Sequence, residues 1–216
     1  MIEIGPVTIT PVGHGSLMIE YASRIIHVDP YSEAADYATL PKADQIWITH
    51  EHFDHLDRTA LDLVRQPTTQ FVAPPTAVDQ LGAPAQINVM RNGDQLTIDG
   101  IHIKAVPAYN AVRERSPGVK FHPKGLGNGY VATFDDHRVY IAGDTEFIPE
   151  MSKLQRIDLA IIPLMLPYTM SPQEAVQAVR SFSPSKVLAY HTTPKDRQEF
   201  AGLMKASGVS VEIMGL

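Results

Sequence analysis

The residues best suited to chemistry lie in one short cluster, His50-x-His52-x-Asp54-His55, which follows the apolar stretch 45–49. Three imidazoles and a carboxylate are ligands that a borderline divalent metal such as zinc accepts. A regular strand or helix could not aim all four at one ion. A loop leaving a strand can divide them, with His50 and His52 on one metal and Asp54 and His55 on its neighbour. The alternative is a polar loop that is rich in histidine by chance.

Two further residues stand at the ends of apolar stretches. Asp144 closes the stretch 140–143, and His191 closes the stretch 187–190. Taken alone, each is more often a cap, a turn residue or a packing residue. Beside a metal-binding loop they become natural completing ligands. The two oxygens of Asp144 could bridge two metals, and His191 could finish the second site.

The elements that must position these residues are short strands and a few helices. Strands are expected over residues 7–11, 17–21, 25–28, 45–49, 70–73, 87–90, 95–98, 101–106, 130–134, 138–142, 159–164, 186–190 and 209–213. Helices are expected over 59–65 and 76–80, after a capping box at 171–174, and over 194–207. Hairpins come first and strand–helix alternation comes last, which predicts an α/β (α+β) protein with mixed sheets.

Composition narrows the class of protein. The 216 residues are 44% apolar, and no stretch is typical of a linker, so we expect one domain over residues 1–216. A net charge of −6 argues against a nucleic-acid partner. The absence of cysteine excludes disulfides and is compatible with a cytoplasmic protein. Without an 18-residue apolar run or a leader-like start, we expect no membrane segment.

These motifs together resemble the metallo-β-lactamase superfamily of metal-dependent hydrolases. The 50–55 cluster, Gly143-Asp144-Thr145 and His191 occur in the family's order, and Asp29 after the stretch 25–28 resembles the family's first motif. The opening Gly13-His14-Gly15-Ser16 is similar to the small branch that includes ascorbate-6-phosphate lactonase-like proteins.

The resemblance implies a four-layer αββα sandwich, in which two mixed β-sheets are flanked by helices and the metals sit at one edge. By motif, His50 and His52 bind the first metal, Asp54, His55 and His191 bind the second, and Asp144 bridges them. Two zinc ions are the expected cofactor, with manganese, iron or nickel as alternatives.

One position departs from the family pattern. Asn110 stands where a third histidine of the first site is expected, and amides are poor zinc ligands. The nearest replacement is His122, on a long loop between Tyr109 and Gly129. His122 is either the substitute ligand or an exposed loop residue, and in the second case the first site is depleted.

The catalytic residues are expected beside the metals. Asp54 is a candidate to hold a hydroxide as well as a metal, and the general acid is one of His14, His122 and Tyr109. Asp29 is expected to orient the metal loop rather than to bind metal, with a turn-capping role before Pro30 as the alternative. Four cations in the loop 109–129, namely Arg113, Arg115, Lys120 and Lys124, either meet an anionic substrate or are solvated.

The leading hypothesis is a hydrolase in which a metal-activated hydroxide attacks an ester, lactone, amide or phosphodiester bond of a small molecule, with an anionic substrate as one option. One alternative is a degenerate-site binding or sensing protein, which Asn110 motivates. Another is an iron-containing redox protein on the same fold. A homo-oligomeric assembly stays open.

Overall fold

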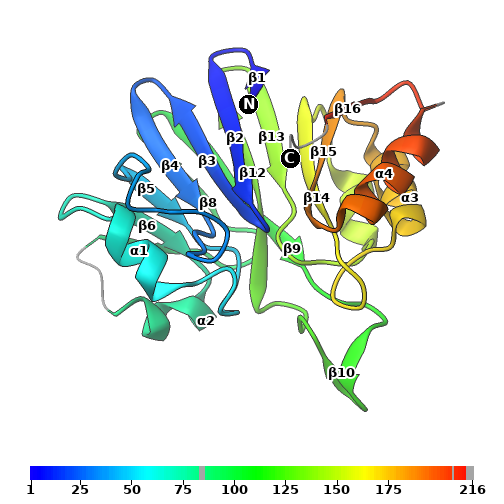
Figure 1. Cartoon of the computed structure of the whole chain (residues 1–216), viewed down its shortest axis with the longest axis horizontal. Coiled ribbons are helices and arrows are strands. Elements are labelled where there is room, and N and C mark those ends of the chain that lie inside the picture. Colours follow the sequence, from blue (N-terminus) through cyan, green and yellow to red (C-terminus); the bar gives the residue numbers. More distant parts are fainter. Residues whose placement is uncertain (83–85, 206, 213–216) are drawn as a thin grey trace. The chain divides into compact units, whose positions relative to one another are not determined.

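The computed structural model describes residues 1–82, 86–205 and 207–212. The chain forms two compact units, residues 1–91 (unit 1) and residues 92–216 (unit 2). Each unit contains a mixed seven-stranded sheet with helices beside it, as Figure 1 shows by colour and label. The expected combination of mixed sheets and flanking helices is therefore confirmed, whereas the single-domain organisation stays a prediction.

Unit 1 runs through its sheet in sequence order, from β1 to β7. Its strands are β1 (Ile2–Ile4), β2 (Val7–Gly13), β3 (Ser16–Tyr21), β4 (Arg24–Val28), β5 (Gln45–Trp47), β6 (Gln70–Ala73) and β7 (Ile87–Val89). Its helical segments are α1 (Arg58–Val64), α2 (Pro75–Val78) and the 3₁₀ turn η1 (Asp79–Leu81). The first four strands pair antiparallel, and β4 to β7 pair parallel.

The parallel half of this sheet places two loops at one edge. Because β4 and β5 run in the same direction, the residues that follow them leave the sheet at the same end. Asp29 follows β4, and the stretch 48–55 follows β5. Helix α1 then covers the sheet, where Leu61 packs into the apolar cluster that contains Ile46 and Phe71. The candidate metal ligands of the stretch 48–55 thus lie between a buried strand and a packed helix.

Unit 2 has the sheet order β16-β15-β14-β13-β12-β9-β8. Its strands are β8 (Gln95–Ile98), β9 (Ile101–Ala108), β12 (Gly127–Phe134), β13 (His137–Ile141), β14 (Leu159–Leu164), β15 (Lys186–Thr192) and β16 (Ser210–Glu212). Its helical segments are the 3₁₀ helix η2 (Pro149–Lys153), α3 (Pro172–Phe182) and α4 (Pro194–Met204). Strands β8, β9, β12 and β13 pair antiparallel, and β13 to β16 pair parallel.

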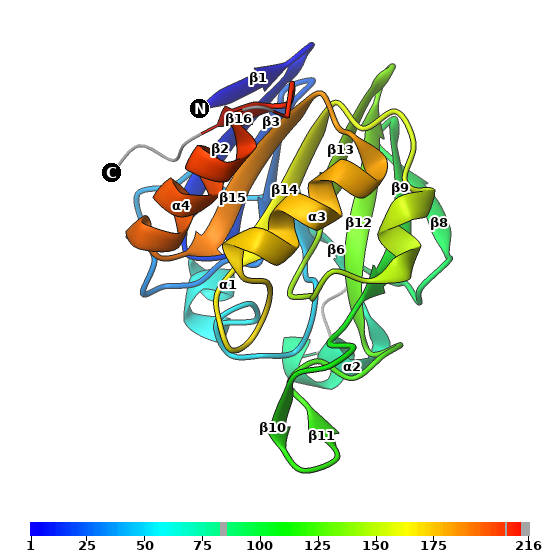
Figure 2. The same cartoon turned by 90° about the vertical axis from the view of Figure 1, so that its right-hand side faces the viewer.

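Helices α3 and α4 lie next to each other on one face of this sheet (Figure 2). The predicted capping box starts α3: the Ser171 side chain accepts from the Glu174 backbone, and the Glu174 side chain accepts from the Ser171 backbone. The apolar side of α3, which includes Val179 and Phe182, is buried in the same cluster as Tyr140 and Ile162. The capped helix therefore covers the strands that carry the residues of unit 2 described below.

Several details differ from the sequence predictions, of which the following are examples. A short first strand, β1, precedes the expected ones. The loop 109–129 contains the hairpin of β10 (Glu114–Ser116) and β11 (Val119–Lys120), which projects from unit 2 in Figure 2. Helix α4 ends at Met204 rather than at residue 207. The last strand begins at Ser210, and Ile213, its expected end, lies outside the described residues.

Across the described residues, no helix has the length and apolar character that crossing a membrane requires.

Candidate metal centre

Asp29 organises the loop 48–55 of unit 1, which carries the candidate metal ligands. Its φ of 45° is in the left-handed region, its side chain is fully buried, and its backbone N–H donates to Trp47 O at 3.0 Å. One carboxylate oxygen accepts from the Thr49 N–H at 2.7 Å. The other accepts from Thr49 Oγ1 at 2.6 Å and lies 2.8 Å from His55 Nδ1. Burial raises the pKa of Asp29 above its usual value. The charge of His55 and the hydrogen bonds from His55 and Thr49 offset only part of this rise.

These contacts select one tautomer for each of two histidines. His55 donates Nδ1–H to the Asp29 carboxylate, so its lone pair is on Nε2. The Thr49 hydroxyl uses its proton on Asp29 and therefore accepts at 2.9 Å from His50 Nδ1. His50 consequently also carries its lone pair on Nε2. Asp29 thus orients two imidazoles in the way that carboxylates behind ligating histidines do.

The ring nitrogens of this loop converge closely. His50 Nε2 lies 3.2 Å from His52 Nδ1, and the ring centroids of His50 and His55 are 4.1 Å apart. Ligand atoms of Asp29, His50 and His55 lie within 4.8 Å of one another. A Cβ atom added to Gly15 would come within 2.7 Å of His55 Cε1. Glycine at this position therefore allows the backbone to pass directly over the His55 ring.

His14 meets the loop from the turn between β2 and β3. Its φ is 50°, and its Nε2 lies 2.9 Å from Asp54 Oδ2. The same Asp54 oxygen lies 3.7 Å from His55 Nε2. The Asp54 carboxylate and the His14 ring are therefore within hydrogen-bond distance at the donor set of unit 1.

Unit 2 presents its own donors at the ends of parallel strands. Asp144 follows β13, and His191 lies near the end of β15, where the register with β14 shifts between Pro163 and Leu164. His191 has a φ of 43°, and this irregularity turns its side chain relative to the regular pleat. Its Nδ1 lies 2.7 Å from Asp144 Oδ1, and both residues are buried.

His122 belongs to the same group of side chains. It is 6% exposed, and its Nε2 lies 3.4 Å from Asp144 Oδ2. The Oδ1 atom of Asn110 accepts from the His122 backbone N–H at 2.7 Å and from its Nδ1 at 2.8 Å. The interpretation of His122 as an exposed loop residue is therefore wrong. Asn110, which occupies the position of the expected histidine, holds His122 with its Nε2 toward Asp144.

A buried carboxylate that sequence reasoning missed, Glu146, fixes Asn110 in turn. It accepts from Asn110 Nδ2 at 3.3 Å and from the backbone N–H groups of Ala111, Val112 and Arg113 at 2.7–2.9 Å. Burial alone would raise the pKa of Glu146, but these hydrogen bonds hold it below its usual value. The only signal in the sequence is an acid two residues after Asp144, and that does not reveal its partners.

The remaining candidates of the loop 109–129 have other contacts. The Tyr109 hydroxyl donates to Glu150 at 3.0 Å and accepts from Lys124 at 3.2 Å, so its assignment as general acid gains no geometric support. Of the loop's cations, Arg113 pairs with Glu146 and Glu174. Lys120 pairs with Glu114, and Lys124 with Glu150. These three cations therefore stabilise unit 2 itself.

Comparison with known proteins gives the family. Residues 8–191 match the family described as the beta-lactamase superfamily domain. A UPF0173 metal-dependent hydrolase of Thermococcus kodakarensis is 31% identical over 208 residues, which cover 89% of this chain and 90% of the relative. The crystal structure of a proposed metal-dependent hydrolase from Parabacteroides distasonis matches with a TM-score of 0.90 and 46% identity, covering 96% of this chain and 92% of that chain.

A more distant structure shows the fold alone. The metallo hydrolase Igni18 from Ignicoccus hospitalis matches with a TM-score of 0.77 and 24% identity, covering 96% of this chain and 94% of that chain.

Two mixed seven-stranded sheets with flanking helices, and His/Asp donors in the loops that follow parallel strands, define a metallo-β-lactamase fold. The chain belongs to the metallo-β-lactamase superfamily and, within it, to the UPF0173 family of metal-dependent hydrolases. By homology it is an enzyme of this metal-dependent class.

Proposed function

We propose that the chain hydrolyses an ester, lactone, amide or phosphodiester bond of a small molecule with the help of two divalent metal ions. The observation that carries this proposal is the fixed protonation of the histidines. The Nδ1 atoms of His50, His55 and His122 are each engaged by a buried acceptor, so each ring keeps Nε2 as its ligand atom. Because any buried ring N–H needs an acceptor, the support comes from three rings with this same orientation among the His and Asp donors of the motifs, not from a single contact.

The proposed ligand sets follow the sequence motifs. His50, His52 and His122 hold the first ion, Asp54, His55 and His191 hold the second, and Asp144 bridges. Nitrogen and carboxylate donors suit zinc, and they also accept manganese, iron or nickel. Zinc is therefore proposed from the type of ligand alone. In each unit the donor set is supported by the local contacts described above.

Bound at these residues, the metals would supply a hydroxide at neutral pH and positive charge for the oxygen that becomes negative in the transition state. The chain's own groups do the rest of the positioning. Asp29 orients two ligand histidines, and Asn110 orients a third. His14 is the proposed proton donor, because its Nε2 lies 2.9 Å from Asp54.

The substrate is proposed by class only. The opening 13–16 supports the ascorbate-6-phosphate lactonase-like branch, so phosphorylated lactones belong among the candidates, in line with a small anionic substrate. The binding-protein alternative rested on Asn110 as a lost ligand. The contacts of Asn110 with His122 count against this alternative, because they place another histidine near Asp144.

The test is hydrolysis by the zinc-reconstituted protein of a panel of nitrophenyl esters, lactones and bis-nitrophenyl phosphate. We expect turnover of at least one substrate class that chelator abolishes and zinc restores. His55→Ala should remove it, whereas the exposed His102→Ala, matched as a histidine variant, should not. Equal turnover by wild type and His55→Ala, or no zinc-dependent turnover of any class, would overturn the proposal.

A further inference from the structure

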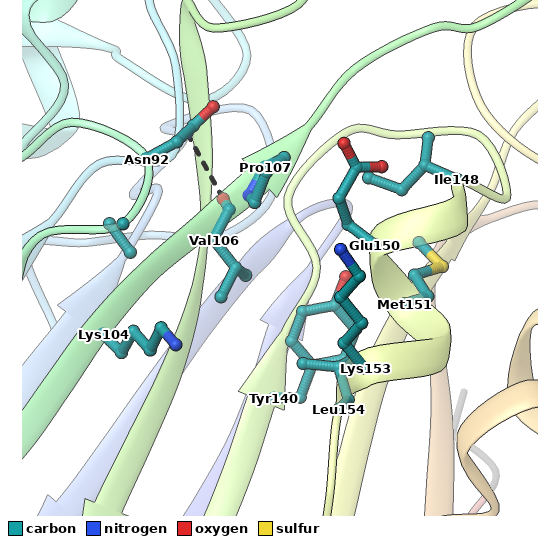
Figure 3. A pocket seen from close by; sticks show the side chains of 12 residues that line it. Asn92, Lys104, Val106, Pro107, Tyr140, Ile148, Glu150, Met151, Lys153 and Leu154 are labelled. Atoms are coloured by element: carbon teal, nitrogen blue, oxygen red, sulfur yellow. Dashed lines mark hydrogen bonds between the residues drawn. The ribbon is translucent and has the colours of Figure 1, made fainter.

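Unit 2 contains a cavity of about 290 Å³ that none of the proposed metal ligands lines. It lies between β9, β13 and the 3₁₀ helix η2 (Figure 3). Most of its wall is apolar and comes from Val106, Pro107, Ile148, Met151 and Leu154. A volume near the lower end of the range for ligand pockets suits a molecule of roughly ten non-hydrogen atoms.

Three polar groups face this cavity without a partner among the residues that the structure describes. Among the described residues, no hydrogen bond or ion pair engages the Tyr140 hydroxyl or the amines of Lys104 and Lys153. Tyr140 is 1% exposed, and its ring packs edge-to-face against the Phe182 ring, with the two ring centroids 5.9 Å apart. In Figure 3, Lys104 enters from β9 and Lys153 from η2, with the Tyr140 ring between them. The Tyr140 hydroxyl opens into the cavity, where a bound molecule can accept its hydrogen bond.

The cavity carries a net positive charge, because the carboxylate in its wall, Glu150, is already paired. Glu150 lines the wall, but one of its oxygens accepts from Lys124 at 2.7 Å and the other from Tyr109 at 3.0 Å. This acid is therefore already neutralised at the rim, and Lys104 and Lys153 are left as the unbalanced charges. Burial raises the pKa of Tyr140, so its phenol stays a neutral donor.

We propose that this cavity binds a small carboxylate with an apolar body, at a site separate from the metal donors. The apolar walls receive the body, and the two ammonium groups and the phenol can donate to the carboxylate oxygens. A carboxylate has room for these three donors. A phosphate ester would more typically meet arginines, and no arginine is among the residues that line this cavity.

The experiment is a titration of the zinc-loaded protein with benzoate, hexanoate and 4-phenylbutyrate, followed by isothermal calorimetry and by amide shifts in NMR spectra. The matching neutral amides are titrated in parallel. We expect at least one acid to bind with shifts at β9 and η2, and its amide to bind about tenfold more weakly. Lys104→Gln/Lys153→Gln should weaken the acid by about tenfold or more, and Tyr140→Phe by a few fold.

Lys195→Gln, on the exposed side of α4, is the matched control and should bind like wild type. Carboxylate binding that survives unchanged in the double lysine variant would locate it at the metals and overturn the proposal. The absence of shifts at β9 and η2 with all three acids would overturn it as well. Neither result touches the hydrolase proposal, because zinc-dependent turnover is measured separately.

Discussion

The side-chain oxygen of Asn110 accepts two hydrogen bonds from His122, one from the backbone N–H at 2.7 Å and one from the ring Nδ1 at 2.8 Å. The double contact fixes both the position of the residue and the tautomer of its ring. A position that lacks the expected histidine is therefore used to place another histidine twelve residues further along the chain.

Removing this acceptor should loosen metal binding. In Asn110→Ala, His122 loses the partner that fixes its ring, and losses of this kind typically lower metal affinity about 10–100-fold. Competition with a chromogenic chelator measures the affinity. Asn88→Ala, an asparagine variant on β7 far along the chain from the donor residues, should leave it unchanged. A wild-type affinity in Asn110→Ala would contradict the role given to the double contact.

Replacing Asp29 should also weaken metal binding, because its carboxylate orients two of the proposed ligands, His50 and His55. Asp29→Asn keeps the size of the side chain but replaces one acceptor oxygen with an N–H₂ group that cannot accept from Thr49 or His55. We expect zinc affinity to fall by at least about tenfold. The exposed Asp36→Asn serves as the comparison, and circular dichroism reports whether the fold is kept. If Asp29→Asn binds zinc like Asp36→Asn, the tautomer argument fails.

Two glycine substitutions should have opposite effects on stability. Gly15→Ala places a Cβ atom 2.7 Å from His55 Cε1, so the ring or the backbone must move. We expect a lower unfolding midpoint and weaker zinc binding. Gly202→Ala on α4 meets no atom within 4 Å and replaces glycine inside a helix, so it should be neutral or add up to about 1 kcal/mol. Equal midpoints for the two variants would speak against the close contact at His55.

Acid should weaken unit 2 through the Arg113–Glu174 pair, whose charged atoms are 2.6 Å apart. Burial alone would raise the pKa of Glu174, but hydrogen bonds from Arg113 and Ser171 hold it below the usual value. A lowered folded-state pKa gives stability that is full above the unfolded value of about 4.3 and is lost as the pH falls through the folded value.

Arg113→Gln should therefore cost about 1–2 kcal/mol of unfolding free energy at pH 7, with the partial exposure of the pair taken into account. The difference from wild type should shrink as the pH falls toward about 3. Urea unfolding between these pH values measures it, with Arg180→Gln on the same unit as the control. A pH-independent difference would show that packing, and not charge, accounts for the loss.

Much of this arrangement was predictable from local patterns. The capping box before α3 and the apolar stretch before His50 are signals within a few residues, and both elements formed as expected. The donors of the 50–55 cluster share one segment, so their proximity needs no long-range information. Whether they bind metal as assigned stays a prediction.

The roles that were missed depend on contacts between distant residues. Asn110 contacts His122 and Glu146 across 12 and 36 positions, and no periodicity encodes such pairs. The sequence predicts a loop at the β10–β11 hairpin, because residues 114–120 are polar and contain Pro117 and Gly118. Its base is instead held by Glu146, whose carboxylate accepts the N–H groups of residues 111–113.

The most direct test of the account is the zinc content of the purified, reconstituted protein, measured by elemental analysis on wild type, His122→Ala and His102→Ala. We predict about two zinc ions per chain in wild type and in His102→Ala, and a fall toward about one in His122→Ala. No zinc in the wild type after reconstitution, or the same content in all three proteins, would contradict the assignment of His122 and the dinuclear centre built on it.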